Sequence, residues 1–254
     1  MKSPLKDNPL RNPGESLDKE INDFLIDEVL MYLLLSALMV VIALFEWFMW
    51  YMNTPPSPWT ISITAMMTVL YSATKIIRAK SKIKSLKQGR DGEKAVGQYL
   101  EKLREHGAQI FHDVPSKGFN LDHVVIIKSG IYVIETKTYS KPDKGEAKII
   151  FTGDSVIVNG KKENEKPIIQ VKAASGWLAE MLFESTGHKF IIKPVVLFPG
   201  WYIEPTSEAK ASNVWVLNPK ALPTFIENSK EQLKPEEVKM ASFHLSRYIR
   251  SYAE

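Results

Sequence analysis

Two long apolar runs dominate the N-terminal third of the chain. Residues 29–52 contain a single charged side chain, Glu46, and residues 59–77 contain only Lys75. At a rise of about 1.5 Å per residue, each run is long enough as a helix to cross a hydrocarbon core of about 30 Å. The connection between them, residues 53–58, is uncharged and rich in proline. The pattern predicts a transmembrane hairpin of two helices.

The flanking charges predict the orientation of this hairpin. The connection carries no charge, whereas a basic run follows the second span: Arg78, Lys80, Lys82, Lys84, Lys87 and Arg90. Positive residues stay on the cytoplasmic side, so we expect both termini and the following domain in the cytoplasm, at a bacterial inner membrane. The basic run is also compatible with contacts to anionic lipid or to nucleic-acid phosphates. Glu46 lies beside a cluster of Trp and Tyr residues, which is typical of an interfacial position.

Residues 1–23 are polar and contain several prolines, and we expect most of this stretch to be flexible. Residues 17–28 have the spacing of a short amphipathic helix that leads to the membrane. We therefore divide the chain into a flexible cytoplasmic N-terminus, the hairpin, a basic linker and a folded domain, at residues 1–28, 29–78, 79–88 and 89–254.

The folded domain mixes the helical and the alternating apolar patterns. The predicted strands are residues 109–114, 121–127, 131–136, 148–151, 155–158, 193–198 and 214–217. The predicted helices are residues 92–104, with Asp91 as N-cap, and residues 167–184, 220–228 and 236–252. The domain contains both helices and strands, and we predict an α/β fold.

Residues 120–137 (NLDHVVIIKSGIYVIETK) are the most informative stretch, because they read as a β-hairpin carrying polar side chains. If Lys128 and Ser129 form the loop, Asp122 lies opposite Glu135. If the loop is Ser129 and Gly130, Asp122 faces Lys137. Side chains alternate between the faces of a strand, so both registers put Asp122, Glu135 and Lys137 on one face.

Two carboxylates opposite each other on apolar strands repel and are costly to bury, unless a cation lies between them. Oxygen ligands favour a hard ion such as Mg²⁺ or Mn²⁺. Such an ion can polarise a phosphate oxygen and activate water, which points to phosphodiester cleavage. Lys137 could position or help deprotonate the water, or stabilise charge on the phosphate. The alternative is a salt-bridged surface patch without catalytic function.

The domain also resembles a known family. Gly92-Glu93, the strand LDHVVI and the strand GIYVIETK are similar, in this order, to the nuclease-related domain. This family is a branch of the PD-(D/E)xK, restriction-endonuclease-like superfamily. The resemblance extends from about residue 89 to about residue 198. It implies a restriction-endonuclease-like mixed sheet flanked by helices, here preceded by the two-helix transmembrane hairpin.

The resemblance also implies roles for individual residues. Asp122, Glu135 and Lys137 take the catalytic positions, and Glu93 is an acid at the start of a helix. Gln170 takes a further polar position on the next helix, although Ala174 stands where some relatives carry Tyr. In this reading Asp122 and Glu135 bind the ion, with the carbonyl of Thr136 as an additional ligand.

The implied activity is metal-dependent cleavage of nucleic acid, more often DNA. The alternative is an inactive, membrane-tethered module that binds or senses nucleic acid, because inactive members of the superfamily exist.

Composition adds two limits. None of the 254 residues is Cys, which excludes disulfides and thiolate zinc sites. The formal net charge of +4 argues little about partners, and the five His residues lack metal-ligand spacing.

Overall fold

The computed structural model describes residues 10–53, 58–142, 146–160 and 163–252. The chain divides into two compact units. The first unit, residues 16–88, is helical. The second contains the described residues up to Glu15 together with Gly89–Glu254 and holds all the strands.

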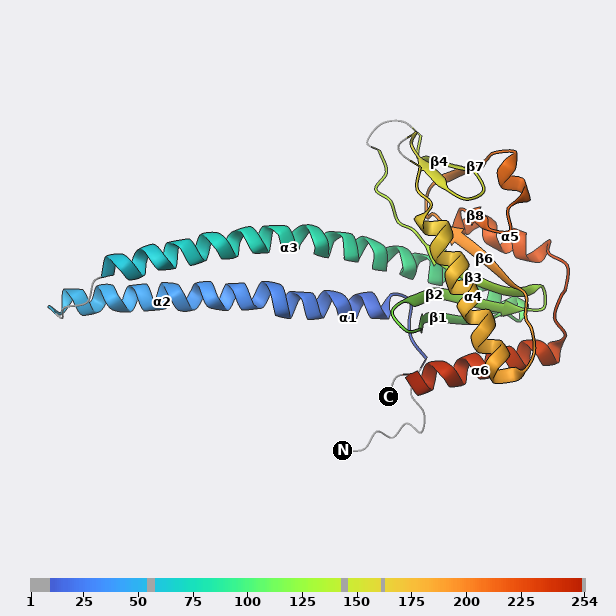
Figure 1. Cartoon of the computed structure of the whole chain (residues 1–254), viewed down its shortest axis with the longest axis horizontal. Helices are drawn as coiled ribbons and strands as arrows, with labels where there is room; N and C mark the ends of the chain where they lie inside the picture. Colours follow the sequence, from blue (N-terminus) through green and yellow to red (C-terminus); the bar gives the residue numbers. More distant parts are fainter. Residues whose placement is uncertain (1–9, 54–57, 143–145, 161–162, 253–254) are drawn as a thin grey trace. The chain divides into compact units, whose positions relative to one another are not determined.

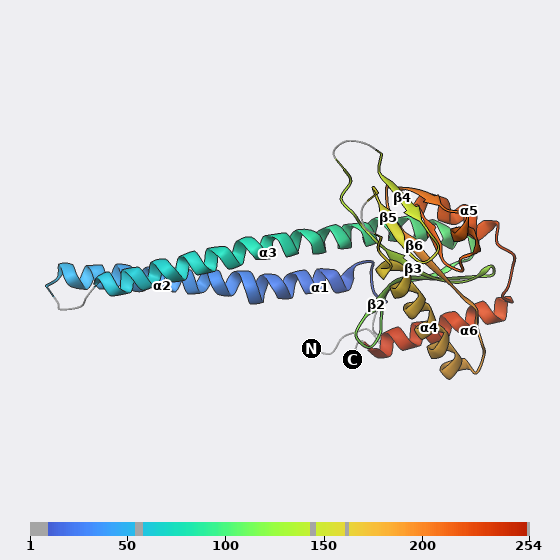
Figure 2. The ribbon, with the colours of Figure 1, turned by 45° about the horizontal axis from the view of Figure 1, so that its top comes forward.

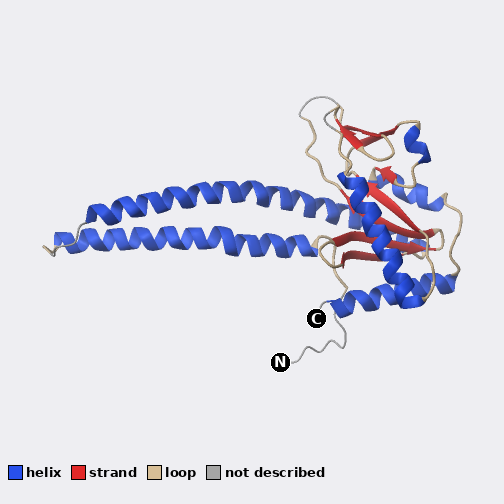
Figure 3. Ribbon diagram, in the orientation of Figure 1, coloured by secondary structure: helices blue, strands red, loops and turns tan. Residues whose placement is uncertain are grey.

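The helical unit consists of two antiparallel arms (Figure 3). One arm contains α1 (Glu15–Phe24), a π-helical turn (Leu25–Leu30) and α2 (Met31–Tyr51). The other arm is the first part of α3 (Pro58–Glu101). No residue of α2 is buried, and large apolar side chains such as Leu44 are mostly exposed.

The two arms meet along a seam of small residues. Ala65, Ser72 and Ala79 are buried and recur every seven residues, the spacing that keeps one helical stripe against a partner helix. Near the end of α2 and the beginning of α3, Trp47 Nε1 donates a 2.9 Å hydrogen bond to Ser62 Oγ. Both helices are long and apolar enough to cross a membrane. Residues 54–57 of the predicted connection lie outside the described residues.

Three local predictions are wrong. The helix predicted from residue 92 is the end of α3, which also contains the predicted basic linker at residues 79–88. Asp91 is therefore not an N-cap; its carboxylate accepts hydrogen bonds from the Arg90 side chain. Residues 79–88 are mostly good helix formers, and the helix continues through Gly89, Gly92 and Gly97. Residues 10–14, which we expected to be flexible, contact the folded domain. The helix predicted at residues 17–28 is confirmed by α1, which begins at Glu15, and by the π-helical turn that follows it.

The main sheet has five strands in the order β1-β2-β3-β6-β8 (Figure 1). Strands β1 (Gln109–Pro115), β2 (Asn120–Ile127) and β3 (Gly130–Thr136) form an antiparallel meander. Strands β6 (Ile192–Leu197) and β8 (Trp215–Leu217) continue the sheet parallel to β3. The sheet is mixed, as predicted, and each of these strands lies within about two residues of its predicted range.

A smaller sheet has the order β5-β4-β7. Strands β4 (Lys148–Phe151) and β5 (Val156–Val158) form the predicted second hairpin. Strand β7 (Tyr202–Pro205), which the sequence pattern did not predict, pairs in parallel with β4. The remaining short elements are 3₁₀ helices at Lys102–His106, Glu208–Ala211 and Pro219–Ala221.

Helices cover both faces of the main sheet. Helices α4 (Lys166–Thr186) and α6 (Pro235–Tyr252) lie side by side on one face (Figures 1 and 2). Their apolar residues share a core cluster with Val124, Ile131 and Val133 of the sheet. The C-terminal end of α3 and the short α5 (Leu222–Glu227) share the other cluster, which contains Val125 and Ile134. The domain is thus a three-layer α/β structure.

Candidate functional site

The central hairpin has one of the two predicted registers. Ile127 pairs with Gly130 and His123 with Ile134, so Lys128 and Ser129 form the loop. Gly130 has φ 147°, a conformation that favours glycine. Continued by one residue, this register puts Asp122 opposite Glu135, although regular pairing ends at His123.

Where the backbone pairing of β2 and β3 ends at His123, contacts made by side chains connect the two strands. Asp122 Oδ2 accepts a 2.6 Å hydrogen bond from the backbone N–H of Thr136. Lys137 Nζ lies 2.6 Å from Glu135 Oε1, and only 13% of the Glu135 side chain is exposed. The three residues that the hairpin pattern singled out therefore lie together at the open end of the hairpin, where β2 begins and β3 ends.

A distortion in β1 adds a fourth polar residue, Asp113. His112 pairs with His123 and Val114 with Leu121, but Asp113 and Asp122 between them do not pair. Asp113 has φ 48°, in the left-handed region that Asp tolerates better than most residues. Its buried carboxylate accepts hydrogen bonds from Arg11 Nη1 at 3.3 Å and from Asn120 Nδ2 at 3.1 Å.

Helix α3 contributes Glu93, which is 9% exposed. A methyl group in place of the Gly92 hydrogen would lie 2.1 Å from Thr138 Cγ2, so only glycine lets the helix approach the end of β3 this closely. Gly92 is thus a packing glycine rather than a helix start. It brings Glu93 to the charged groups of the sheet. We call Glu93, Asp113, Asp122 and Glu135 the acid cluster.

The acid cluster is electrostatically unbalanced. Burial, and then the charges of Asp113 and Glu135, raise the pKa of Glu93 to about 7. Burial, and then the charges of Glu135 and Glu93, raise the pKa of Asp122 well above its usual value. Burial lowers the pKa of Lys137, but the charge and hydrogen bond of Glu135 outweigh it, so the net shift is upward and Lys137 stays protonated.

The donor set of the cluster fits a hard divalent ion. All its ligand atoms are oxygens. If all four carboxylates were ionised, as a bound cation favours, they would leave with Arg11 and Lys137 a formal charge of about −2, which one divalent cation would neutralise. Thr136 Oγ1 is buried and has no hydrogen-bond partner in the described part of the chain. As the side chains stand, no group of three His, Cys, Asp or Glu residues among those described is close enough to bind a metal.

Gln170 is not brought to this cluster. It lies on α4, and its side chain is exposed. Across the described residues, no hydrogen bond or ion pair joins it to the acids or to Lys137. Its role in the site stays a prediction.

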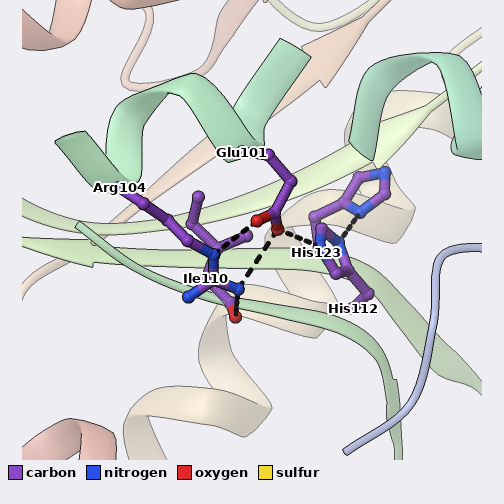
Figure 4. Close-up of polar contacts among 5 residues, drawn as sticks. All are labelled: Glu101, Arg104, Ile110, His112 and His123. Atoms are coloured by element: carbon purple, nitrogen blue, oxygen red, sulfur yellow. Dashed lines mark hydrogen bonds and ion pairs between the residues drawn. The ribbon is translucent and has the colours of Figure 1, made fainter. Parts of the chain in front are cut away.

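A second polar cluster lies next to the first, under the following turns of α3 (Figure 4). His112 Nδ1 is 2.8 Å from His123 Nδ1, and His112 Nε2 is 2.9 Å from Glu101 Oε1. Arg104 binds both oxygens of Glu101 and donates to the carbonyl of Ile110. We call Glu101, Arg104, His112 and His123 the histidine network.

The hydrogen bonds assign one tautomer to each neutral ring. Burial lowers the pKa of His112 and lowers that of His123 well below the usual value, so both are neutral near pH 7. The Glu101 carboxylate only accepts, so the proton of His112 is on Nε2 and its Nδ1 accepts from His123 Nδ1–H. His123 Nε2 is then a buried lone pair, without a partner within the described residues.

Sequence patterns missed Asp113, Arg11 and the histidine network. Asp113 and His112 are polar residues within the apolar strand QIFHDV, which is a signal that could have marked them. Arg11 carries no such signal, because 102 residues separate it from Asp113.

Comparison with known proteins supports a nuclease-related function. Residues 88–199 match the family model of the nuclease-related domain. The matched stretch contains the whole acid cluster, Lys137 and Gln170, but not Arg11. No curated protein matches the chain.

One similar solved structure is that of SfsA from Pyrococcus furiosus in complex with Ca²⁺. It is 16% identical, with a TM-score of 0.27. The match covers 51% of this chain and 54% of SfsA, so the chain spans about half the length of that protein. A likeness at this TM-score does not establish a common fold.

Proposed function

We propose that the chain is a membrane-anchored nuclease that uses Mg²⁺ or Mn²⁺ to hydrolyse phosphodiester bonds, with DNA as substrate. The observation that carries this proposal is the gathering of Glu93, Asp122, Glu135 and Lys137 at one end of the β2–β3 hairpin. All four lie within the stretch that matches the nuclease-related domain. A restriction-endonuclease-like fold is part of the proposal.

Asp122 and Glu135 would hold the divalent ion, and the carbonyl of Thr136 would be a further ligand. When bound, such an ion polarises a phosphate oxygen and lowers the pKa of water. Glu93 would support the ion or its water shell from α3. These roles assign a function to carboxylates that are otherwise crowded at a cost.

Lys137 has the clearest role among the side chains. Its raised pKa keeps it an ammonium group at neutral pH, so it is a poor base. We therefore assign it to orienting water and to stabilising the negative charge that develops on the phosphate during attack. Glu135, at 2.6 Å, fixes its position.

The proposed anchor is the helical pair of α2 and the first part of α3. The side chains of α2 are apolar and exposed, which water penalises and lipid does not. Residues 10–14, which precede α1, pack within the folded unit, so the chain leaves this unit into the helical pair and returns to it after the pair. A chain that crosses the bilayer twice meets this condition, with the basic residues 78–90 on the domain's side.

The test of the activity is cleavage of plasmid and oligonucleotide DNA by the full chain in detergent, with Mg²⁺ and with Mn²⁺. We expect cleavage by the wild type and a loss of at least about 100-fold in Lys137→Ala, the usual effect of removing a charge-stabilising group. If neither ion supports cleavage above the level of the variant, the nuclease proposal is wrong. Retained DNA binding would then favour the non-cutting module.

The test of the anchor is membrane extraction. We expect the full chain to stay in the membrane pellet after alkaline carbonate washing and to dissolve in detergent. Release of the chain by carbonate alone would contradict the two-span proposal.

A further inference from the structure

The segment of residues 10–15, which we call the N-terminal strap, contacts two members of the acid cluster. Arg11 Nη1 lies 3.3 Å from Asp113 Oδ2. The backbone of Gly14 makes a hydrogen bond to Glu93. The strap thus touches one acid from the sheet and one from α3.

Asp113 depends on this contact. Only 2% of its side chain is exposed, and Asn120 binds its other oxygen. A buried carboxylate is stable only when it is paired and hydrogen-bonded, and removing one partner of such a pair is costly. Arg11 is the cation of the pair, and 23% of its side chain remains exposed.

The strap also packs closely on α3. A methyl group at Gly97 would lie 2.5 Å from Pro13 Cγ, so the strap and the helix approach each other at a point where only glycine fits. Gly97 follows Glu93 by four residues and lies on the same face of α3. Proline in the strap and glycine on the helix therefore fix Arg11 and Gly14 beside the acids.

We propose that Arg11 is a positioning residue of the nuclease-like site: by pairing with Asp113 it orients the acid cluster, so the site is completed by the segment that precedes the membrane hairpin. Arg11 lies outside the residues that match the nuclease-related domain. Its role in cleavage rests on the proposed function, whereas its pairing with Asp113 does not. An isolated domain that starts at residue 89 would lack this contact.

A different role for Arg11 would be direct contact with a substrate phosphate. A cavity of about 570 Å³ adjoins the strap, and Lys94 and Arg104 line it together with Arg11. Direct contact would raise KM when Arg11 is removed, whereas loss of positioning would lower kcat. The two roles are therefore separable by kinetics.

The experiment is a double-mutant cycle on the full chain in detergent, with Arg11→Ala, Asp113→Asn and both together. We expect Arg11→Ala to lower kcat for oligonucleotide cleavage about 10-fold or more, with KM within about twofold. The double variant should be no slower than the slower single variant, because both changes remove one interaction. Arg11→Lys should recover part of the activity. The matched control is Arg247→Ala, an exposed arginine on α6, with activity within about twofold of wild type.

Losses that multiply in the double variant, or a rise in KM alone, would overturn the proposal. Thermal unfolding of the four proteins of the cycle, which are the wild type, the two single variants and the double variant, gives a readout that does not need cleavage. Arg11→Ala should lower the melting temperature, and adding Asp113→Asn should restore most of it, because the buried carboxylate that lost its Arg11 partner is then replaced by a neutral group. If the wild type cuts nothing but the cycle shows this rescue, the proposed function fails and the pairing stands. If the two melting shifts simply add, the pairing fails as well.

Discussion

The acid cluster and the histidine network lie under one stripe of α3 but are built in opposite ways. Glu93, Gly97 and Glu101 are spaced by four residues, so they face the sheet in successive turns. Below Glu101, donors and acceptors alternate in one chain of hydrogen bonds that ends at the buried His123 Nε2. Below Glu93, acids face acids, and two pKa values rise far above their usual range.

This difference separates a structural cluster from a binding site. A buried network in which donors meet acceptors rigidifies the fold, and here only the terminal His123 Nε2 lacks a partner within the described residues. Like charges held together cost stability and persist where a ligand or reaction uses them. The histidine network, which orders β1 and β2 next to Asp113 and Asp122, is the scaffold in this comparison. Substitutions in it should lower stability, whereas neutral substitutions of Glu93 and Asp122, whose pKa values are raised, should raise stability and remove function.

The largest effect on stability is expected for His112→Ala. The change removes a buried ring and leaves the Nδ1–H of His123 without an acceptor, which together cost about 3 kcal/mol of the free energy of unfolding. Urea denaturation followed by near-UV circular dichroism measures this. His106→Ala, an exposed histidine of the same region, should change stability by less than about 0.5 kcal/mol. Equal effects of both substitutions would remove the structural role of the network.

In contrast to His112→Ala, Glu93→Gln should raise the free energy of unfolding, and it should do so only above acidic pH. Folded Glu93 keeps its proton up to about pH 7, whereas the unfolded residue loses it near 4.5, so the folded chain binds more protons in this window. Stability should therefore fall as pH rises from 4.5 to 7 in the wild type, by up to about 3 kcal/mol, and should fall less in Glu93→Gln. The measurement is urea denaturation at pH 5 and pH 8 in EDTA. A variant less stable than the wild type at pH 8 would contradict the crowding of the acids.

The smallest effect is expected for Gln170→Ala. Because Gln170 is exposed and lies outside both clusters, cleavage should change less than about threefold and stability by less than about 0.5 kcal/mol. A loss of about 10-fold or more in kcat would mean that Gln170 reaches the site once nucleic acid is bound, as its family position implies.

Local patterns predicted the core of the fold and half of the candidate site. The hairpin, with one of the two registers that its sequence allows, and helix α4 follow from alternation, turn residues and a first-turn proline, all of which act between near neighbours. The meeting of Asp122, Glu135 and Lys137 follows from the alternation of side chains, which puts them on one face in either register.

The rest depends on contacts between distant residues. Arg11 and Asp113 are 102 residues apart, and nothing in the polar N-terminus marks Arg11 as part of a site. The family resemblance and the N-cap candidate Asp91 predict a helix start at Gly92, yet α3 continues through this glycine, which allows a close approach to Thr138. Strand β7 was missed because only four residues pair with β4.

The most direct test of the acid cluster as a metal site is calorimetric titration of the full chain with Mn²⁺ in detergent. We predict one ion per chain for the wild type, no measurable binding for Asp122→Asn, and unchanged binding for Glu101→Gln in the histidine network. No binding by the wild type, or equal binding by wild type and Asp122→Asn, would contradict the account.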